Sequence, residues 1–459
     1  MNWLSNKQVL ATSLLVLMIL MVQTLGIPGT DLTVSQSITA AILIIAAILW
    51  VTEWVSLFVV SFLILALELV WLMPALEADG ITVVTASFFS PFFSNLILLF
   101  LGGFVLSSLM QKYGLDIRFA QWILRQTKGN PSQTLLGIIL ACSFLSMWIS
   151  NTATTAMMLT MVFPLVRRIA DNQPFRKALV LAIPFACNLG GIGTPIGTPP
   201  NAIALTYLAQ KGITLSFTQW ILLTMPFLII FLLMLWQGLL RLYPAGDLKL
   251  DIPERVVGDF TGKHWFALAV FIATAIGWLV GGNFGYATGT IALFPIIIVF
   301  WFGLLDTNDF RGLPWDVLYM VSGGLALGVA LNVTGLGSVL VNLLPLGASP
   351  WTLMAVAGLV AVVMSTVMSN TATAGLFIPL VMNLDFEQDY MLALVLTLAL
   401  MCSMAMALPV STPPNAIAFS SRAINTKDMV ITGGLISIVG FAIVLAIGPL
   451  YWAWMLTWI

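Results

Sequence analysis

Apolar residues divide almost the whole chain into segments long enough to cross a lipid bilayer. About 20 apolar residues in a helix span the roughly 30 Å hydrocarbon core, and such stretches recur from one end of the sequence to the other. Charged loops, glycine and proline separate them, which predicts eleven crossing helices. These cover residues 9–27, 36–52, 54–75, 92–111, 178–209, 219–241, 264–281, 286–304, 315–335, 390–421 and 430–456.

Two further apolar segments, residues 132–165 and 347–382, each carry a polar motif near the centre. The motif reads Ser-Asn-Thr from Ser150 in the first segment and from Ser369 in the second. Each segment is long enough for two half-crossings that meet at a polar tip, so we interpret both as re-entrant hairpins. Non-helical backbone at membrane depth is tolerated only where it is buried in protein or lines a watery cavity. The hairpins therefore imply a binding site at their tips.

Composition and charge agree with an all-α polytopic membrane protein. Of 459 residues, 60% are hydrophobic and 8% are charged, whereas soluble domains contain about 25% charged residues. With a cytoplasmic N-terminus, the predicted crossings place sixteen of the seventeen Lys and Arg in the cytoplasm and only Lys211 outside, as the positive-inside rule requires. We therefore expect a multi-pass protein of the plasma (inner) membrane with its C-terminus outside, and no nucleic-acid partner.

The sequence Thr-Pro-Pro-Asn-Ala-Ile-Ala occurs twice, starting at Thr198 and at Thr412. It follows the Ser-Asn-Thr motif in both halves, because 219 residues separate Ser150 from Ser369 and 214 separate Thr198 from Thr412. Five predicted crossings lie between the hairpins, and an odd number inverts the second copy. Each proline pair removes a backbone donor in mid-span, so both helices are predicted to unwind there. Inverted repeats with broken helices are typical of secondary transporters, which bind substrate where the repeats meet.

The segments around the motifs contain no charged side chain. These segments are residues 132–165, 180–209, 347–382 and 390–420. Hydroxyls, amides and helix N-termini suit an oxyanion. Carbonyls freed at the breaks, together with side-chain oxygens, suit a small cation. A dianion would be poorly compensated in such a place, because burying uncompensated charge is costly. The pattern therefore predicts bound sodium as the counter-charge.

Through the paired Ser-Asn-Thr hairpins and the paired Thr-Pro breaks, the chain resembles the divalent-anion/sodium symporter family of di- and tricarboxylate transporters over essentially its whole length. The resemblance implies sodium-coupled import of a di- or tricarboxylate by alternating access, with a C4-dicarboxylate such as succinate as the first expectation. It also implies a homodimer in which a transport part slides against a scaffold, as in an elevator. Scaffold helices would occupy residues 1–127 and 243–340, and the transport part residues 128–242 and 341–459.

The resemblance also assigns site residues by position. One sodium site would use Ser146, Ser150, Asn151 and the backbone at Gly197, and the other Ser365, the Met368 carbonyl, Asn370 and Ser411. Substrate contacts would come from Asn151, Thr152, Asn370 and Thr371, with Thr198, Pro199, Thr412 and Pro413 at the sides. Apart from sodium as the coupling ion, no cofactor is expected.

Three alternatives compete with the symporter. A sodium-independent dicarboxylate exchanger could use the same fold, a channel would need a continuous polar pathway, and an enzyme would need reactive groups within the spans. Glu68 is the one acid well inside a predicted span. An acid within the membrane raises the hypothesis of proton coupling, but we expect Glu68 to make an interfacial or scaffold contact away from both motifs. The sequence does not choose among succinate, fumarate, malate, citrate, tartrate and sulfate.

The hairpin interpretation predicts that the loops at Lys128 and at Arg168 lie on the same, cytoplasmic, side, because the segment between them does not cross. Single cysteines placed in each loop should therefore react with an impermeant maleimide only after the membrane is opened. Labelling of the two loops from opposite faces of intact cells would contradict the hairpin and the inverted repeat.

Overall fold

A computed structural model describes residues 6–25, 32–251, 258–342, 349–382, 384 and 386–458. Within these residues the regular structure is entirely helical. Ten of the described helices are long and apolar enough to cross a membrane, and four more are apolar but shorter. The prediction of an all-α, multi-pass membrane protein is confirmed. The predicted segment ends at residues 26–27 and 347–348 lie outside the described residues.

All eleven predicted spans contain helix. The first half comprises α1 (Asn6–Leu25), α2 (Val34–Thr52), α3 (Leu57–Leu67), η1 (Glu68–Leu72), α4 (Met73–Ala78), α5 (Ala86–Phe89), η2 (Ser90–Phe93), α6 (Asn95–Lys112), α7 (Leu115–Gln126), α8 (Pro131–Ser146), α9 (Asn151–Arg168), α10 (Phe175–Gly190), η3 (Gly191–Gly193), α11 (Pro199–Gln210) and α12 (Phe217–Leu242). The second half comprises α13 (Gly262–Gly281), η4 (Gly282–Phe284), α14 (Thr288–Trp301), α15 (Thr307–Arg311), α16 (Trp315–Thr334), α17 (Leu336–Asn342), α18 (Pro350–Val367), α19 (Asn370–Val381), α20 (Gln388–Ser403), α21 (Pro413–Ser420) and α22 (Thr426–Leu456).

Helix α7 has no counterpart among the predicted spans. It is a 12-residue helix, too short to cross a bilayer, and its apolar residues recur at helical spacing along one side. Ala120 and Leu124, four residues apart, are buried on that side, whereas Trp122 is exposed. A search for long apolar stretches misses such an amphipathic helix, because only its spacing is distinctive.

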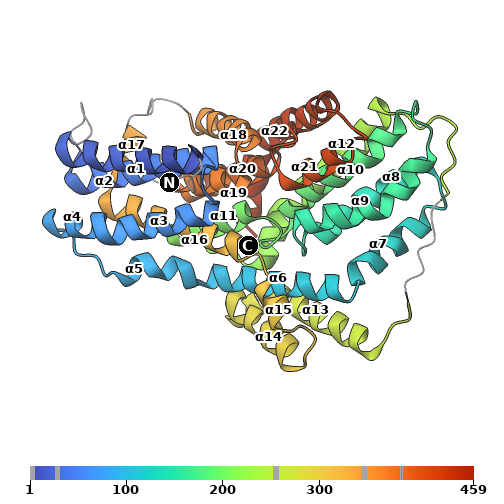
Figure 1. The fold of residues 1–459 in the computed structure, drawn as a ribbon, viewed down its shortest axis with the longest axis horizontal. Coiled ribbons are helices and arrows are strands. Elements are labelled where there is room, and N and C mark those ends of the chain that lie inside the picture. Colours follow the sequence, from blue (N-terminus) through green and yellow to red (C-terminus); the bar gives the residue numbers. More distant parts are fainter. Residues whose placement is uncertain are drawn as a thin grey trace.

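The two halves of the chain pack through equivalent pairs of helices. Helix α8 packs on α10 as α18 packs on α20, and α10 contacts α12 as α20 contacts α22. Other pairs cross between the halves: α9 meets α21 as α19 meets α11, and α6 meets α14 as α16 meets α3. Figure 1 shows these sequence-distant helices lying together. The predicted repeat therefore has a matching pattern of contacts, and the halves interlock.

Two glycine pairs allow the interlocking helices to approach closely. A Cβ atom on Gly102 of α6 would lie 2.7 Å from the Ala292 Cβ of α14, and one on Gly323 of α16 would lie 2.3 Å from the Ser61 Cβ of α3. Small residues drive helix packing in membranes in this way, because lipid provides no hydrophobic force between helices. The Gly-Gly sequence in each half was a repeat signal that the motif analysis did not use.

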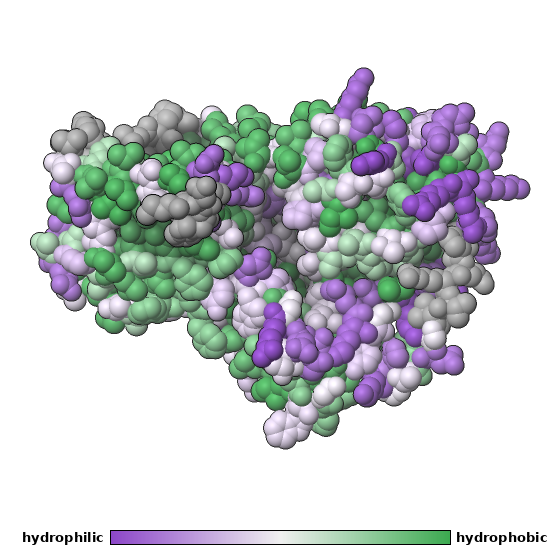
Figure 2. All heavy atoms as spheres, viewed as in Figure 1, coloured by the Kyte–Doolittle hydropathy of each residue, from purple (hydrophilic) through white to green (hydrophobic). Residues whose placement is uncertain are grey.

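Helices α8 and α9 contact each other, and their outer ends lie together. The Leu250 amide donates to the Gly129 carbonyl at 3.0 Å, next to the start of α8, and Asp251 pairs with Arg168 at the end of α9. Figure 2 shows hydrophilic side chains gathered at this end of the molecule, where α7, α8 and α9 lie in Figure 1. The segment thus folds back on itself; its return to one side of a membrane stays a prediction.

The close contact at Gly323 predicts that Gly323→Ala lowers the melting temperature of the detergent-purified protein. Overpacking costs about 1–3 kcal/mol, more than the helix propensity that alanine gains. The matched control is Gly238→Ala in α12, where a Cβ meets no atom within 4 Å, so its melting temperature should stay level or rise. Equal effects of the two substitutions would refute tight packing of α16 on α3.

Candidate functional site

The first Ser-Asn-Thr motif forms the turn between α8 and α9. Ser150 is the N-cap of α9, and its hydroxyl accepts a hydrogen bond from the Ala153 amide at 3.2 Å. Ser146, the last residue of α8, donates its hydroxyl proton to Asn151 Oδ1 at 2.5 Å. An N-cap serine satisfies one of the amides that a helix start leaves unpaired. The motif thus begins a helix in the protein interior and fixes the Asn151 side chain.

The second motif repeats this local structure. Ser369 caps α19 by accepting from the Ala372 amide at 3.4 Å, and Ser365 donates to Asn370 Oδ1 at 2.7 Å. Ser365 also contacts the Cys402 carbonyl of α20 at 2.8 Å. The shared Ser-x-x-x-Ser-Asn-Thr spacing therefore encodes the same hydrogen bonds in both halves.

Both predicted helix breaks are present, but each lies before its proline pair. Helix α10 ends at Gly190 and α11 begins at Pro199; α20 ends at Ser403 and α21 begins at Pro413. The expectation that the prolines interrupt a continuing helix was inaccurate. Proline is well suited to the first turn of a helix, where its missing N–H has no intrahelical partner to lose. The prolines start the second half-helices, and the unwound segments precede them.

Two asparagines inside the repeated Thr-Pro-Pro-Asn sequence hold the unwound segments. Asn201 Nδ2 donates to the carbonyls of Gly191 and Thr194, both at 2.8 Å. Asn415 Nδ2 donates to the carbonyls of Met406 at 3.3 Å and Leu408 at 3.0 Å. Both asparagines are fully buried. Sequence reasoning did not assign them a role, although their occurrence in the repeat was a usable signal.

Hydrogen bonds join the two hairpin tips and the two breaks. Thr194 of the first break donates to the Met147 carbonyl beside the first tip at 2.5 Å. Ser411 of the second break donates to the Thr366 carbonyl beside the second tip at 2.9 Å. The breaks are connected through Asn188 Nδ2, which lies 3.2 Å from Thr412 Oγ1. Four segments from both halves of the chain are therefore linked by hydrogen bonds, and Asn188 is a linking residue that the motifs did not reveal.

Most residues of the first predicted sodium set lie together. Ser146 contacts Asn151 as described, and a Cβ atom on Gly191 would lie 3.0 Å from Asn151 Oδ1 and 3.1 Å from the Gly197 carbonyl oxygen. Ser150 is adjacent to Asn151 in the chain, with its hydroxyl engaged in the helix cap. Hydroxyl, amide and carbonyl oxygens are hard donors of the kind that suit a small cation.

The second predicted set has the same arrangement. Ser365 and Asn370 are hydrogen bonded, and Ser411 reaches the end of the same helix through the Thr366 carbonyl. Met368 is the C-cap of α18 and has extended backbone, with φ −131° and ψ 172°. Its carbonyl lies in the turn between α18 and α19, in the short stretch that separates Ser365 from Asn370.

The predicted substrate residues occupy the starts of four helices. Thr152 and Thr371 lie in the first turns of α9 and α19; Thr371 is buried and Thr152 is half-buried. Thr198 and Thr412 are the N-caps of α11 and α21. Pro199 and Pro413 are the first residues of these two helices.

A cavity of about 530 Å³ opens between α9 and α21. Its lining consists of Ala156, Leu159, Thr160, Phe163, Pro164, Arg167, Ile417, Ser420 and Ser421. The equivalent region of the other half is filled: Tyr207 of α11, which corresponds to Ser421 in the repeated sequence, donates to the Gly324 carbonyl of α16 at 3.0 Å. The two halves are alike in fold, but they differ in how they meet the surrounding helices.

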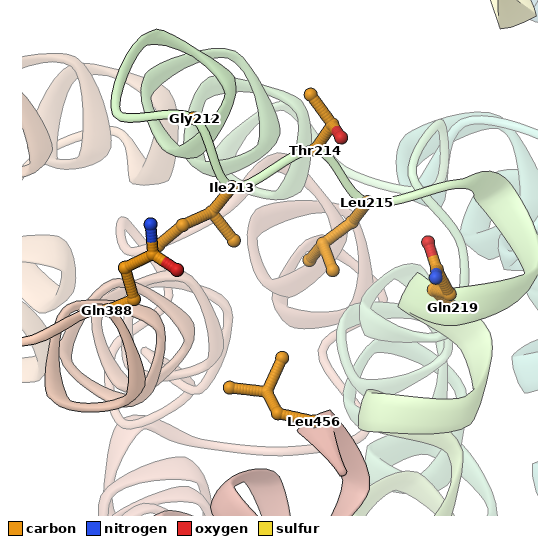
Figure 3. Close-up of a pocket in the computed structure, with 7 residues that line it drawn as sticks. All are labelled: Gly212, Ile213, Thr214, Leu215, Gln219, Gln388 and Leu456. Atoms are coloured by element: carbon orange, nitrogen blue, oxygen red, sulfur yellow. The ribbon is translucent and has the colours of Figure 1, made fainter. Parts of the chain in front are cut away.

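A smaller cavity, of about 180 Å³, lies at the ends of α11 and α22. Figure 3 shows that Ile213, Gln388 and Leu456 surround it, with Gln219 at its edge. None of its lining residues belongs to a hairpin tip or a break. It is therefore separate from the site.

Comparison with known proteins agrees with this architecture. Residues 47–401 match the citrate transporter family. The chain belongs to this family. The prediction of a relationship to di- and tricarboxylate transporters is thereby confirmed, and family membership points to a transporter and not to an enzyme.

Relatives of this member of the citrate transporter family include transporters named for different substrates. A sodium-dependent dicarboxylate transporter of Staphylococcus saprophyticus is 28% identical over 88% of this chain and 85% of its own length. An inorganic phosphate transporter of Saccharomyces cerevisiae is 30% identical over 88% of this chain and 45% of its own length. An uncharacterized transporter of Schizosaccharomyces pombe is 29% identical over 95% of this chain and 52% of its own length. The chain thus spans about half of the two yeast relatives.

The contacts of Asn415 predict that Asn415→Ala destabilises the protein, because it leaves the Met406 and Leu408 carbonyls unpaired in the interior. Each buried group without a partner costs about 1–3 kcal/mol, which should lower the melting temperature measurably. The matched control is Asn332→Ala, since Asn332 is exposed on α16 and makes one long hydrogen bond of 3.5 Å. Equal melting temperatures of the two variants would contradict the proposed role of Asn415.

Proposed function

We propose that this protein is a secondary transporter that couples the import of a di- or tricarboxylate to sodium, with a C4-dicarboxylate such as succinate as the first candidate. The observation that supports this proposal is the chain of hydrogen bonds that links both hairpin tips and both helix breaks, in segments without charged side chains. Each half contributes the same hydroxyl, amide and carbonyl groups, so the site offers two equivalent sets of donors and acceptors.

The helix starts explain why the substrate should be an anion. Helices α9, α11, α19 and α21 all begin at the site, and a helix N-terminus presents unpaired amides and the positive end of the helix dipole. Thr152 and Thr371 add hydroxyl donors in the first turns. A carboxylate at either end of a dicarboxylate would thus meet the start of a helix from each half.

The absence of charged side chains from the motif segments explains why a cation should bind with the anion. A dianion in an apolar interior is costly without compensating charge, and these segments supply none. The oxygen groups around Asn151 and Asn370 are placed to bind one sodium ion each. Two sodium ions would then neutralise a dicarboxylate.

The difference between the two halves suggests an alternating-access state. With Arg167 on the cytoplasmic side, as its charge predicts, the cavity between α9 and α21 opens inward. The other side is sealed where Tyr207 contacts α16. We propose that α3, α6, α14 and α16 belong to a frame and that the hairpins and broken helices move against it, as in an elevator. A homodimer in the plasma membrane, with a cytoplasmic N-terminus, is part of this proposal.

Phosphate is a second candidate substrate, because a yeast relative is named as an inorganic phosphate transporter. Phosphate is also a compact oxyanion, and it could use the same amide and hydroxyl donors. A sodium-independent exchanger remains the alternative mechanism. In that case a second anion, and not a cation gradient, would drive transport.

Uptake into proteoliposomes tests the function. Labelled succinate should accumulate with an inward sodium gradient and not with potassium or choline in its place. Unlabelled phosphate, citrate and malate in excess then report the substrate preference by competition. Uptake that ignores sodium but needs dicarboxylate inside the vesicles would establish the exchanger, and uptake of phosphate alone would replace the carboxylate.

The same assay tests the substrate residues. Thr152→Ala and Thr371→Ala should each raise the apparent KM for succinate by about ten- to a hundredfold, because a hydrogen bond to a charged group contributes roughly 1.5–3 kcal/mol. Thr274→Ala in α13 is the control, since its hydroxyl bonds only within its own helix, to the Val270 carbonyl. Normal KM values in both site variants would place the anion elsewhere.

A further inference from the structure

Glu68 is a buried carboxylic acid with no described polar partner. Its side chain is completely buried (0% exposed), and neither carboxyl oxygen has a hydrogen-bond partner. From the sequence we expected an interfacial or scaffold contact, and Glu68 is buried among helices without a hydrogen-bond partner. Glu68 also begins η1, a π-helical turn inserted between α3 and α4, and such turns frequently occur at functional sites.

Glu68 lies between the proposed frame and the proposed moving part. Leu72 of the same π-helical turn belongs to one buried apolar cluster with Leu327 of α16 and Leu376 of α19. Tyr207 of α11 packs against the same helix, α16, at Gly324 and Gly328. The hydroxyl of Tyr207 is the group that seals α11 against α16 at Gly324.

Few other ionisable groups are near Glu68. Helices α2, α3 and α4 pack against η1; α2 and α3 have no ionisable side chain, and α4 has only Glu77, which is exposed. In α16, Asp316 is exposed and Tyr319 packs against Phe62. Helix α19 has no ionisable side chain. Among the described residues of these elements, no cation is available to Glu68, and the titratable group of α11 is the Tyr207 phenol.

The repeat shows that packing at this position does not require an acid. The matching contacts of Ser61 with Gly323 and of Ala292 with Gly102 align α3 with α14. Seven residues further along, Glu68 corresponds to Val299, which is equally buried. An apolar side chain therefore fills the equivalent position in the other half, and the carboxyl group of Glu68 needs a different explanation.

We propose that Glu68 is a proton-binding site linked to the movement of α11 and α19 against the frame. A buried carboxylate without a partner is costly, so the described arrangement holds the neutral acid with its proton. When Tyr207 leaves Gly324, water reaches Glu68, the O–H bond ionises and the proton passes to water. Proton binding to Glu68 thus stabilises the conformation in which the cavity between α9 and α21 is open. Alkaline pH favours the conformation in which this cavity is closed.

A cysteine reporter tests this linkage without any substrate. Cys142, Cys187 and Cys402 are buried, so Ser420→Cys in the cavity can be labelled selectively with a maleimide. The rate is compared with that of Lys128→Cys, at an exposed position, from about pH 5.5 to about pH 9. The reporter is placed in the otherwise unchanged protein, in Glu68→Gln and in the control Glu77→Gln.

In the unchanged protein, the relative labelling rate should fall at least about threefold at alkaline pH, as the population shifts away from the open cavity. Glu77→Gln should behave in the same way, whereas Glu68→Gln should change less than about 1.5-fold. Glu68→Val, which copies the residue of the other half, gives a second neutral variant should the first fail to fold. Parallel pH curves with and without Glu68 would overturn the proposal.

The linkage rests on the proposed movement but not on the proposed substrate. Labelling needs neither sodium nor anion, so the two proposals fail separately. Sodium-driven uptake together with a flat labelling curve would refute the proton site alone. Glu68-dependent labelling without succinate uptake would support the proton site and refute the substrate.

Discussion

Unpaired backbone groups in an apolar interior impose the constraint on which this structure depends. A helix that starts or stops leaves amides or carbonyls without intrahelical partners, and lipid cannot supply replacements. The site contains four helix starts and the unwound segments that precede them. Asn201 and Asn415 satisfy the carbonyls of the unwound segments, and Thr194 and Ser411 tie these segments to the hairpin tips. With the carbonyls satisfied, the amides at the helix starts are left for the anion of the proposed function.

The repeat makes the site nearly symmetric, and its surroundings make it asymmetric. The same serine–asparagine bonds occur at both tips, at 2.5 and 2.7 Å. Beyond the tips, however, Tyr207 closes one side against α16, whereas Ser421, its counterpart, lines a cavity. Two halves with the same sequence pattern thus differ in their surroundings. In the proposed transporter, an exchange of these surroundings between the halves would open the other side, as alternating access in an inverted repeat requires.

Local patterns predicted much of this fold, because apolar length and proline act over short stretches of chain. The spans, the polar tips and the existence of both breaks could be predicted in this way. The position of each break could not, since the unwound segment is fixed by Asn201 or Asn415 reaching back across the gap. Asn188 also escaped prediction, because its partner Thr412 lies in the other half of the chain. Helix α7 was missed for another reason: its signal is spacing along 12 residues and not length.

The central claim is that sodium and the anion bind together in one uncharged site. The most direct test is calorimetric binding of succinate to the purified protein across sodium concentrations, with choline replacing sodium at constant ionic strength. The account predicts that succinate affinity rises at least about tenfold with saturating sodium, and that succinate raises sodium affinity by the same factor, because coupling between sites is reciprocal. Succinate affinity that stays constant at all sodium concentrations would contradict the account.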